Sequence, residues 1–262
     1  MKKIFSLILS LLILTSPAFS ETWPNLLKKI NNKYAGFEDQ IKTKTIEQSL
    51  ISYTPQGEIN TEAVFYSQGD KFRVEAKIDM ANLPPQMKGM TTISIFDSEN
   101  MWIISPLTGK KKIPIGRNDK PQTGIDWWKE LAETAKIIGN EKIEKNNCYV
   151  IDASKSNSAF TKLWLDEKEL ILRKAEGNSP QQGKMLYEFS DFKILKGSWK
   201  VPYKTTIHMN ETISTIATVT SFKINETFRA DLFDPSKIES TGGMNIQDMI
   251  NMMSEYKKQT EQ

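Results

Sequence analysis

The sequence predicts a mainly β (α+β) protein whose strands form one large curved antiparallel sheet or barrel. In residues 71–78, apolar side chains alternate with charged ones along the whole run, which is typical of a strand with one buried face and one wet face. About a dozen segments of similar length follow residue 37, separated by Gly, Asn, Asp or Pro turns. The chain has 262 residues, of which 39% are hydrophobic and 26% charged, so one domain with a sizeable core is expected.

The strand at 71–78 also predicts which side chains face inward. We expect Phe72, Val74, Ala76 and Ile78 to face the concave side of the sheet, and Lys71, Arg73, Glu75 and Lys77 to face solvent. Further strands are expected at 91–96, 100–105, 148–153, 161–166, 170–176, 184–195, 201–209 and 215–224.

Three helical segments accompany the predicted sheet. Pro24 suits a first helical turn, and the apolar residues of 26–34 share one helical face. A second helix is expected after the capping pattern at 123–126, with a wide apolar stripe. That stripe consists of Ile125, Trp128, Leu131, Ala132, Ala135 and Ile138. A third helix is expected after Asn245, with Ile246, Met249, Ile250 and Met253 on one side.

The first twenty residues have the composition of a secretory signal peptide. Lys2 and Lys3 precede an apolar run over 4–14, and residues 18–20 fit a small-x-small cleavage site. We therefore expect residues 1–20 to be removed after Ser20, a domain over 21–238 and a Met-rich helical tail over 239–262. No later run of apolar residues is long enough to form a transmembrane helix in the mature chain.

The residue inventory excludes most kinds of catalytic site. His208 and Cys148 are the only histidine and cysteine, so neither an internal disulfide nor a usual Cys/His zinc site can form. No Gly-x-Ser-x-Gly nucleophile elbow occurs, and the glycines at 177 and 183 do not have phosphate-loop spacing. The sequence thus predicts a protein that is not an enzyme and that has no metal, no cofactor and no catalytic residue.

Charge argues against a nucleic-acid partner. The formal net charge is +3, and Lys2 and Lys3 of the signal segment contribute to it. The mature surface is therefore close to neutral, whereas a dedicated nucleic-acid binder has a concentrated basic excess.

Methionine is distributed unevenly. Met80, Met87 and Met90 fall in one short loop that also contains Pro84, Pro85 and Gly89, and four more methionines lie in the terminal segment. The unbranched, polarizable side chain of methionine suits a surface that adapts to variable apolar partners. The same composition is also found where a segment merely covers a packed core, and both interpretations stay open at this point.

Several motifs, in order along the chain, together resemble the outer-membrane lipoprotein-sorting (LolA/LolB-like) family. They are Gly-Asp-Lys-Phe-Arg-Val at 69–74, the paired segments within 94–106, 138–141 with 148–151, 162–166 with 172–174, and 225–235 ending in Leu-Phe-Asp-Pro. An Arg-Pro pair is frequent in that family ahead of the position of Phe72, but residues 67–70 of this chain read Ser-Gln-Gly-Asp. In that family the arginine of the pair helps to hold the lid closed. This chain lacks the pair, so the resemblance assigns no such residue here.

The resemblance implies an incomplete antiparallel β-barrel of about 11 strands with helices covering the open, concave side. It also implies a periplasmic binding or carrier protein for a hydrophobic ligand, such as a lipid or the acyl chains of a lipoprotein. A membrane-bound donor or acceptor protein would be a further partner. The expected apolar wall and lid of the ligand site are Phe72, Val74, Ile78, Met80, Met87, Met90, Ile93, Ile95, Trp102 and Trp128. The alternative is a periplasmic interaction or sensor domain whose barrel is filled by its own side chains and which docks a partner protein.

The signal segment gives a direct prediction. If residues 1–20 are a signal peptide, exported protein recovered from the periplasmic fraction should begin at Glu21. Intact-mass measurement and N-terminal sequencing of that fraction test this expectation. Exported protein that still begins at Met1 would contradict it.

Overall fold

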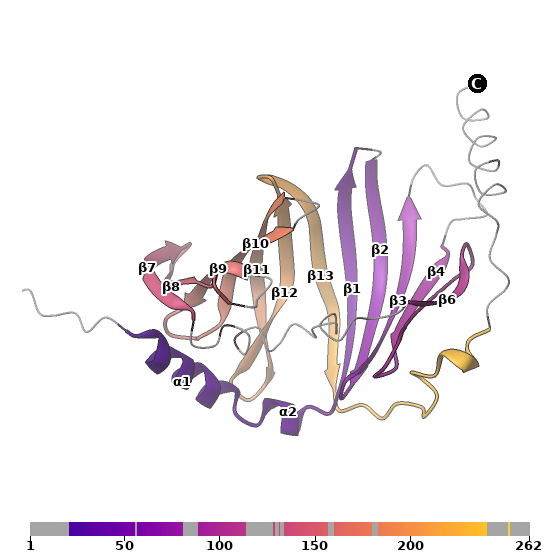
Figure 1. The fold of residues 1–262 in the computed structure, drawn as a ribbon, viewed down its shortest axis with the longest axis horizontal. Coiled ribbons are helices and arrows are strands. Elements are labelled where there is room, and N and C mark those ends of the chain that lie inside the picture. The colour runs from indigo at the N-terminus through magenta and orange to yellow at the C-terminus, as the bar shows by residue number, and fades with distance from the viewer. Residues whose placement is uncertain are drawn as a thin grey trace, which may run out of the picture.

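The described part of the chain forms a single antiparallel sheet with 13 strands. The computed structural model describes residues 21–55, 57–80, 89–113, 128, 131, 134–156, 160–179, 183–239 and 251. The strand order is β6-β5-β4-β3-β2-β1-β13-β12-β11-β10-β9-β8-β7, so nearly every strand pairs with its neighbour along the sequence. The exception is the pair β1 and β13, which joins the two halves of the sheet. Figure 1 shows the strands running side by side from β7 to β6, with the helices along the lower edge.

The strands vary from five to fourteen residues. They are β1 (Thr43–Thr54), β2 (Gly57–Gln68), β3 (Lys71–Met80), β4 (Thr91–Phe96), β5 (Met101–Ser105), β6 (Gly109–Ile113), β7 (Lys136–Ile143), β8 (Asn146–Asp152), β9 (Phe160–Asp166), β10 (Leu172–Ser179), β11 (Gly183–Lys196), β12 (Trp199–Met209) and β13 (Thr212–Ile224). The helices are α1 (Trp23–Tyr34), α2 (Phe37–Gln40) and a 3₁₀ turn, η2 (Pro235–Lys237).

The mainly β prediction is confirmed, but the expected incomplete barrel of about 11 strands is not, because the described strands form one open sheet of 13. Strands β1 and β2 are rich in Thr, Ser and Glu, so their alternation is weak in the sequence although each has 12 residues. Strand β6 is only Gly-Lys-Lys-Lys-Ile, which has no apolar alternation. Strands β6 and β7 are the two edges of the sheet, and no pairing between them closes it in the described part of the chain.

Helix α1 covers one end of the sheet, as its apolar face predicts. Pro24 lies in its first turn, where the missing N–H costs no hydrogen bond. Leu26 and Ile30 are fully buried against Ile151 and Leu163 of strands β8 and β9. The wider prediction of helices that cover the open side is not confirmed, because among the described residues α1 packs on the β7–β11 part of the sheet and reaches β12 only at Trp199.

The last part of the segment predicted as the second helix belongs to strand β7. Trp128, Leu131 and Ala135 of its apolar stripe do reach the core beneath α1, whereas residues 125 and 132 lie outside the described residues. Ile138, placed on the same stripe, instead belongs to β7 and is 58% exposed. The ladder to β8 skips a residue between Ile137 and Gly139, so Ile138 has no cross-strand partner there. Short apolar runs of this kind fit either period, and pairing with β8 decides the outcome.

After β13 the chain returns across the other side of the sheet. Phe228, Leu232, Phe233 and Ile238 of this returning segment pack against side chains of β2, β4 and β5. We call residues 226–238 the strap. Asp234 caps the 3₁₀ turn η2 in it by accepting a hydrogen bond from the Ser236 N–H. The predicted third helix and the Met-rich tail lie outside the described residues, apart from the helical Asn251.

None of the helices among the described residues is long and apolar enough to cross a membrane.

A buried carboxylate shapes the turn between β9 and β10. Asp166 is 3% exposed. Its Oδ1 accepts hydrogen bonds from the N–H groups of Lys168 and Glu169 at 2.9 and 2.8 Å. Its Oδ2 accepts hydrogen bonds from Arg173 Nε and Nη2 at 3.1 and 2.9 Å. Burial by itself would raise the pKa of this carboxyl, but the N–H donors and the guanidinium outweigh it and lower the pKa below its usual value.

Asp166→Asn should therefore destabilise the protein. The amide can accept on one atom only and carries no charge opposite Arg173, so the free energy of unfolding should fall by about 2 kcal/mol at pH 7. Because the folded-state pKa is lowered, this stabilisation is present above the unfolded-state pKa of about 4 and is lost as the pH falls through the folded-state value. Urea unfolding of both proteins between pH 7 and pH 2 should thus show a difference that shrinks with acid. Asp191→Asn, whose partner is the exposed Lys193, is the matched control with little effect at any pH. A constant difference down to pH 2 would contradict the assignment.

Candidate functional site

The two faces of the sheet have different cover. Residues that lie directly opposite each other in paired strands share one face of the sheet. By this rule, Ile151, Leu163, Ala175, Tyr187 and Ile207 lie on one face. The same face continues through Thr215, Ser52 and Ile59 to Met80 at the end of β3. We call this the helix face, because α1 packs on its β7–β11 part. The opposite face, on which the strap packs, is called the strap face.

Beyond α1, the helix face carries half-buried apolar side chains with polar side chains between them. The apolar ones come from strands β12, β13, β1, β2 and β3 and are Ile207, Ala217, Leu50, Phe65, Val74 and Ala76. Threonine and serine residues interleave with them. We call these six residues the apolar wall. Each loses only part of its contact with water in the folded chain, so the wall retains apolar surface that a ligand could bury.

The structure divides the predicted ligand-binding residues between the two faces. Phe72, Val74 and Ile78 do share the helix face, as their alternation in β3 predicts. Phe72 is buried between the rings of Phe65 and Phe96, whose centroids lie 5.9 and 5.7 Å away. Ile78 lies farther along the strand and is 37% exposed.

Ile93, Ile95 and Trp102 lie on the strap face, so they cannot form one wall with Phe72. Ile95 pairs with Arg73 and with Trp102, so these three side chains lie on the same face. Ile93, two residues before Ile95 in β4, shares that face. There they pack against Leu232 and Phe233. The alternation of apolar side chains within each strand is visible in the sequence. Which alternate side chains of β4 share a face with Phe72 and Val74 of β3 depends on the pairing register.

The remaining predicted residues have separate positions. Trp128 is 4% exposed in the core beneath α1, with its ring stacked on Tyr34 at 4.5 Å and its Nε1 donating to Asn31 Oδ1 at 3.0 Å. Met80 is the last residue of β3, and Met90 is half-buried and accepts a hydrogen bond at its backbone oxygen from the Ile78 N–H at 3.4 Å. Met87 lies outside the described residues.

Arg73 corrects the expectation that every charged residue of β3 faces solvent. It is 5% exposed, because the strap covers it. Its Nη1 donates to the Leu232 backbone oxygen at 3.0 Å, and its Nε donates to Glu75 Oε1 at 2.7 Å. The guanidinium thus holds the strap onto β3 and has its charge balanced by a neighbouring carboxylate on the same face.

Asp97 and Trp102 are joined by a hydrogen bond at the turn between β4 and β5. Asp97 Oδ1 accepts the N–H groups of Glu99 and Asn100, and Oδ2 accepts the Trp102 Nε1–H at 2.9 Å. Burial opposes ionisation, but these donors prevail and lower the pKa of Asp97. The carboxylate therefore shapes the β4–β5 turn.

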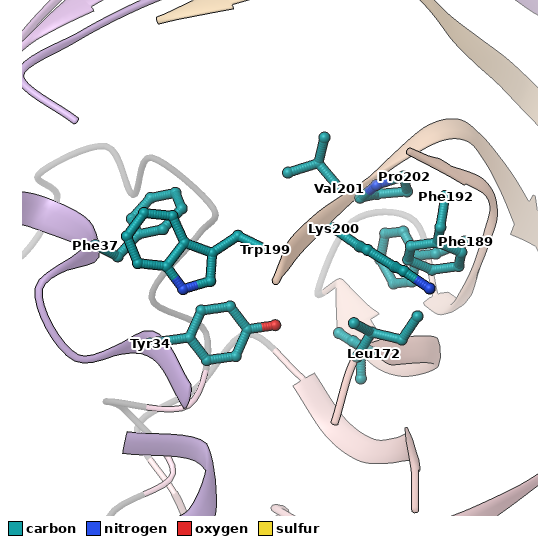
Figure 2. Close-up of a pocket in the computed structure, with 10 residues that line it drawn as sticks. Tyr34, Phe37, Leu172, Phe189, Phe192, Trp199, Lys200, Val201 and Pro202 are labelled. Atoms are coloured by element: carbon teal, nitrogen blue, oxygen red, sulfur yellow. The ribbon is translucent and has the colours of Figure 1, made fainter. Parts of the chain in front are cut away.

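A small aromatic pocket lies on the lower end of the helix face, near the link between α1 and α2. It has a volume of about 120 Å³ and is lined by Tyr34, Phe37, Ile171, Leu172, Phe189, Phe192, Trp199, Lys200, Val201 and Pro202. Figure 2 shows the rings of Tyr34, Phe37 and Trp199 on one side of this aromatic pocket and Lys200 with Phe189 and Phe192 on the other. The Trp199 and Phe37 rings meet edge to face at 4.6 Å, and Trp199 Nε1 donates to the Lys33 backbone oxygen at 2.8 Å. The helices and the sheet are thus locked together at this pocket.

None of the residues of this pocket was predicted as a site residue. Apart from Ile171, which precedes β10, they come from α1 and α2 near the start of the chain and from β10, β11 and β12 far along it. The only local signal is the clustering of Tyr34 with Phe37, which by itself is equally typical of a core.

Tyr34 lines the pocket, whereas the single cysteine and the single histidine lie on the other face of the sheet. The Tyr34 hydroxyl donates to the Leu170 backbone oxygen at 3.3 Å, and burial raises its pKa to about 12. Cys148 is buried on the strap face, and burial raises its pKa to about 11. His208 Nε2 lies 3.0 Å from Glu188 Oε2, also on the strap face. Among the described residues, no group of three or more His, Cys, Asp or Glu side chains comes together as metal ligands do.

Comparison with known proteins bears on the fold. No protein-family model matches the sequence, and no curated protein matches it. Solved structures do match. A domain assigned to outer membrane lipoprotein sorting in Vibrio parahaemolyticus superposes with a TM-score of 0.55 at 14% identity, over 80% of this chain and 95% of the other. A LolA superfamily protein of Nitrosomonas europaea gives a TM-score of 0.54 at 12% identity, over 81% and 99% of the two chains.

The chain has the fold of LolA-superfamily proteins. A DUF1329 family protein of Desulfovibrio piger has it as well, with a TM-score of 0.57 at 12% identity over 82% of this chain and 97% of the other. The resemblance in the sequence motifs is therefore confirmed at the level of the LolA-like fold, although the identities are low.

The hydrogen bond from Arg73 to the strap can be tested by substitution. Arg73→Ala removes the donor to Leu232 and leaves Glu75 without its partner, so the free energy of unfolding should fall by about 2 kcal/mol. Amide hydrogen exchange should also quicken over residues 228–238, because the strap loses its polar attachment. Lys71→Ala, an exposed position of the same strand, is the control and should change neither quantity. Unchanged exchange in the strap of Arg73→Ala would refute this role.

Proposed function

We propose that this chain is a periplasmic, non-enzymatic binding or carrier protein that shields a hydrophobic ligand, a lipid or the acyl chains of a lipoprotein. The observation that carries the proposal is the apolar wall on the helix face, beyond the part that α1 covers. The LolA-like fold supports it, since the neighbour from Vibrio parahaemolyticus is assigned to lipoprotein sorting. The signal-like first twenty residues support export to the periplasm.

The mechanism is transfer out of water rather than bond chemistry. Each methylene of an acyl chain that is buried against the wall contributes about 0.8 kcal/mol. Side chains of the wall are half-buried in the protein alone, so ligand burial adds to existing packing and does not have to displace a filled core. Release then needs a partner with a better site, such as a membrane-bound acceptor protein.

The methionines keep their proposed role as a lid. Met80 is the last residue of β3 and Met90 precedes β4, so the segment that joins the two strands begins at the end of the strand that carries Val74 and Ala76 of the wall. Met87 belongs to that segment. Methionine side chains repack around apolar chains of different length, which suits a cover over a carrier site.

Substitutions in the wall test the carrier. Leu50→Asn and Ile207→Asn each place an amide on the helix face and should weaken binding of a fluorescent long-chain fatty acid, and of its neutral methyl ester, about tenfold. Ser49→Asn and Thr206→Asn, neighbours that point to the strap face, are matched controls and should bind as the unmodified protein does. Fluorescence titrations give the affinities, and thermal melts show that the variants fold.

Two results would count against this function. The first is a lack of saturable binding of both probes by the unmodified protein, which would favour a domain that docks a partner protein. The second is equal weakening by the wall variants and their controls, which would place the ligand elsewhere.

A further inference from the structure

The aromatic pocket has a cation, Lys200, at its edge. Lys200 lines the pocket beside Phe189 and Phe192 (Figure 2). Its Nζ donates to Glu169 Oε1 at 2.5 Å, and its side chain remains 31% exposed. A lysine ammonium has three donors, and the carboxylate of Glu169 takes one of them. Lys200 can therefore donate to a second anion at the mouth of the pocket.

Neighbouring charges leave an excess of positive charge at this edge. Glu169 receives Lys200, lies 3.7 Å from Arg173 Nη2, and accepts the Lys33 ammonium at its backbone oxygen. Asp166 is paired with Arg173. Three cations thus face two carboxylates, and the surplus favours one further negative charge.

The size of the pocket limits what lies beside that charge. A volume of about 120 Å³ is comparable with cavities of about 150 Å³ that hold a single benzene ring, so the pocket can take a few methylenes of a chain. Its lining is dominated by aromatic and aliphatic side chains, which suits such a group.

The pocket and the apolar wall lie on one strand, which connects them. Val201 lines the pocket, and Tyr203, Thr205 and Ile207 follow it at alternate positions of β12. Six residues of strand span about 20 Å, so a long chain that starts at the pocket can reach the wall along β12.

We propose that the ligand is a long-chain carboxylate, held with its carboxylate on Lys200, its first carbons in the aromatic pocket and the rest of its chain along the apolar wall. This rests on the proposed carrier function and adds to it a recognition element for the charged end. The carboxylate distinguishes a free fatty acid from neutral lipids and esters. The pair with Lys200 is partly exposed to solvent, so it contributes selectivity and the chain contributes most of the affinity.

The test compares palmitate with methyl palmitate in titrations against the full mature chain. Palmitate should bind the unmodified protein about fivefold more tightly than its ester, which is the range for one partly exposed ion pair. Lys200→Gln keeps the length of the side chain but removes its charge, so the two probes should then bind equally. Lys204→Gln, at an exposed position of the same strand, is the matched control and should keep the preference. High salt should reduce the preference in the unmodified protein, a measurement that needs no variant.

The outcomes separate this inference from the carrier function beneath it. If both probes bind the unmodified protein equally, or if the preference survives in Lys200→Gln, the assignment of Lys200 is overturned while the apolar wall still binds. If neither probe binds, the carrier function itself fails. A preference that disappears in Lys200→Gln and in high salt, and persists in Lys204→Gln, establishes the carboxylate site.

Discussion

A wide antiparallel sheet that does not close has two faces, and each must bury its apolar side chains against another part of the chain. In this protein the two covers come from opposite ends of the described sequence. Helix α1 packs on the helix face through Leu26 and Ile30, and the strap packs on the strap face through Leu232 and Phe233. Because α1 covers only part of the helix face and the strap lies on the other face, the middle of the helix face is left with half-buried side chains from β12 to β3. The proposed ligand site exists because this cover is incomplete.

Buried polar groups keep both covers in register with the sheet. Arg73 joins β3 to the strap through the Leu232 oxygen, and Trp199 joins β12 to the end of α1 through the Lys33 oxygen. Asp166 fixes the turn that presents Glu169 and Leu170 to the aromatic pocket. Each of these bonds is worth only about 1–2 kcal/mol, but a misplaced cover would leave the same groups buried without partners. They therefore specify the arrangement more than they stabilise it.

The aromatic pocket and the apolar wall divide the work of binding between them. The apolar surface of the wall can bind any acyl chain and does not distinguish one from another. The pocket adds a defined shape and a positive charge at Lys200. A carrier benefits from this division, because apolar area alone gives affinity without selecting one amphiphile over another.

The sequence by itself determined the features that depend on local period and composition. The alternation in β3, the buried face of α1 and the LolA-like order of motifs all follow from residues close together in the chain. Tertiary structure decided what depends on register and on distant segments. Ile93, Ile95 and Trp102 fell on the strap face, Arg73 was buried by a strap that arrives about 160 residues later in the chain, and Ile138 entered a strand through its neighbour β8. The aromatic pocket was invisible in the sequence for the same reason, because nearly all its residues come from five elements that meet only when the sheet is assembled. A one-residue change of register would move a strand's side chains to the other face, and no local pattern encodes that choice.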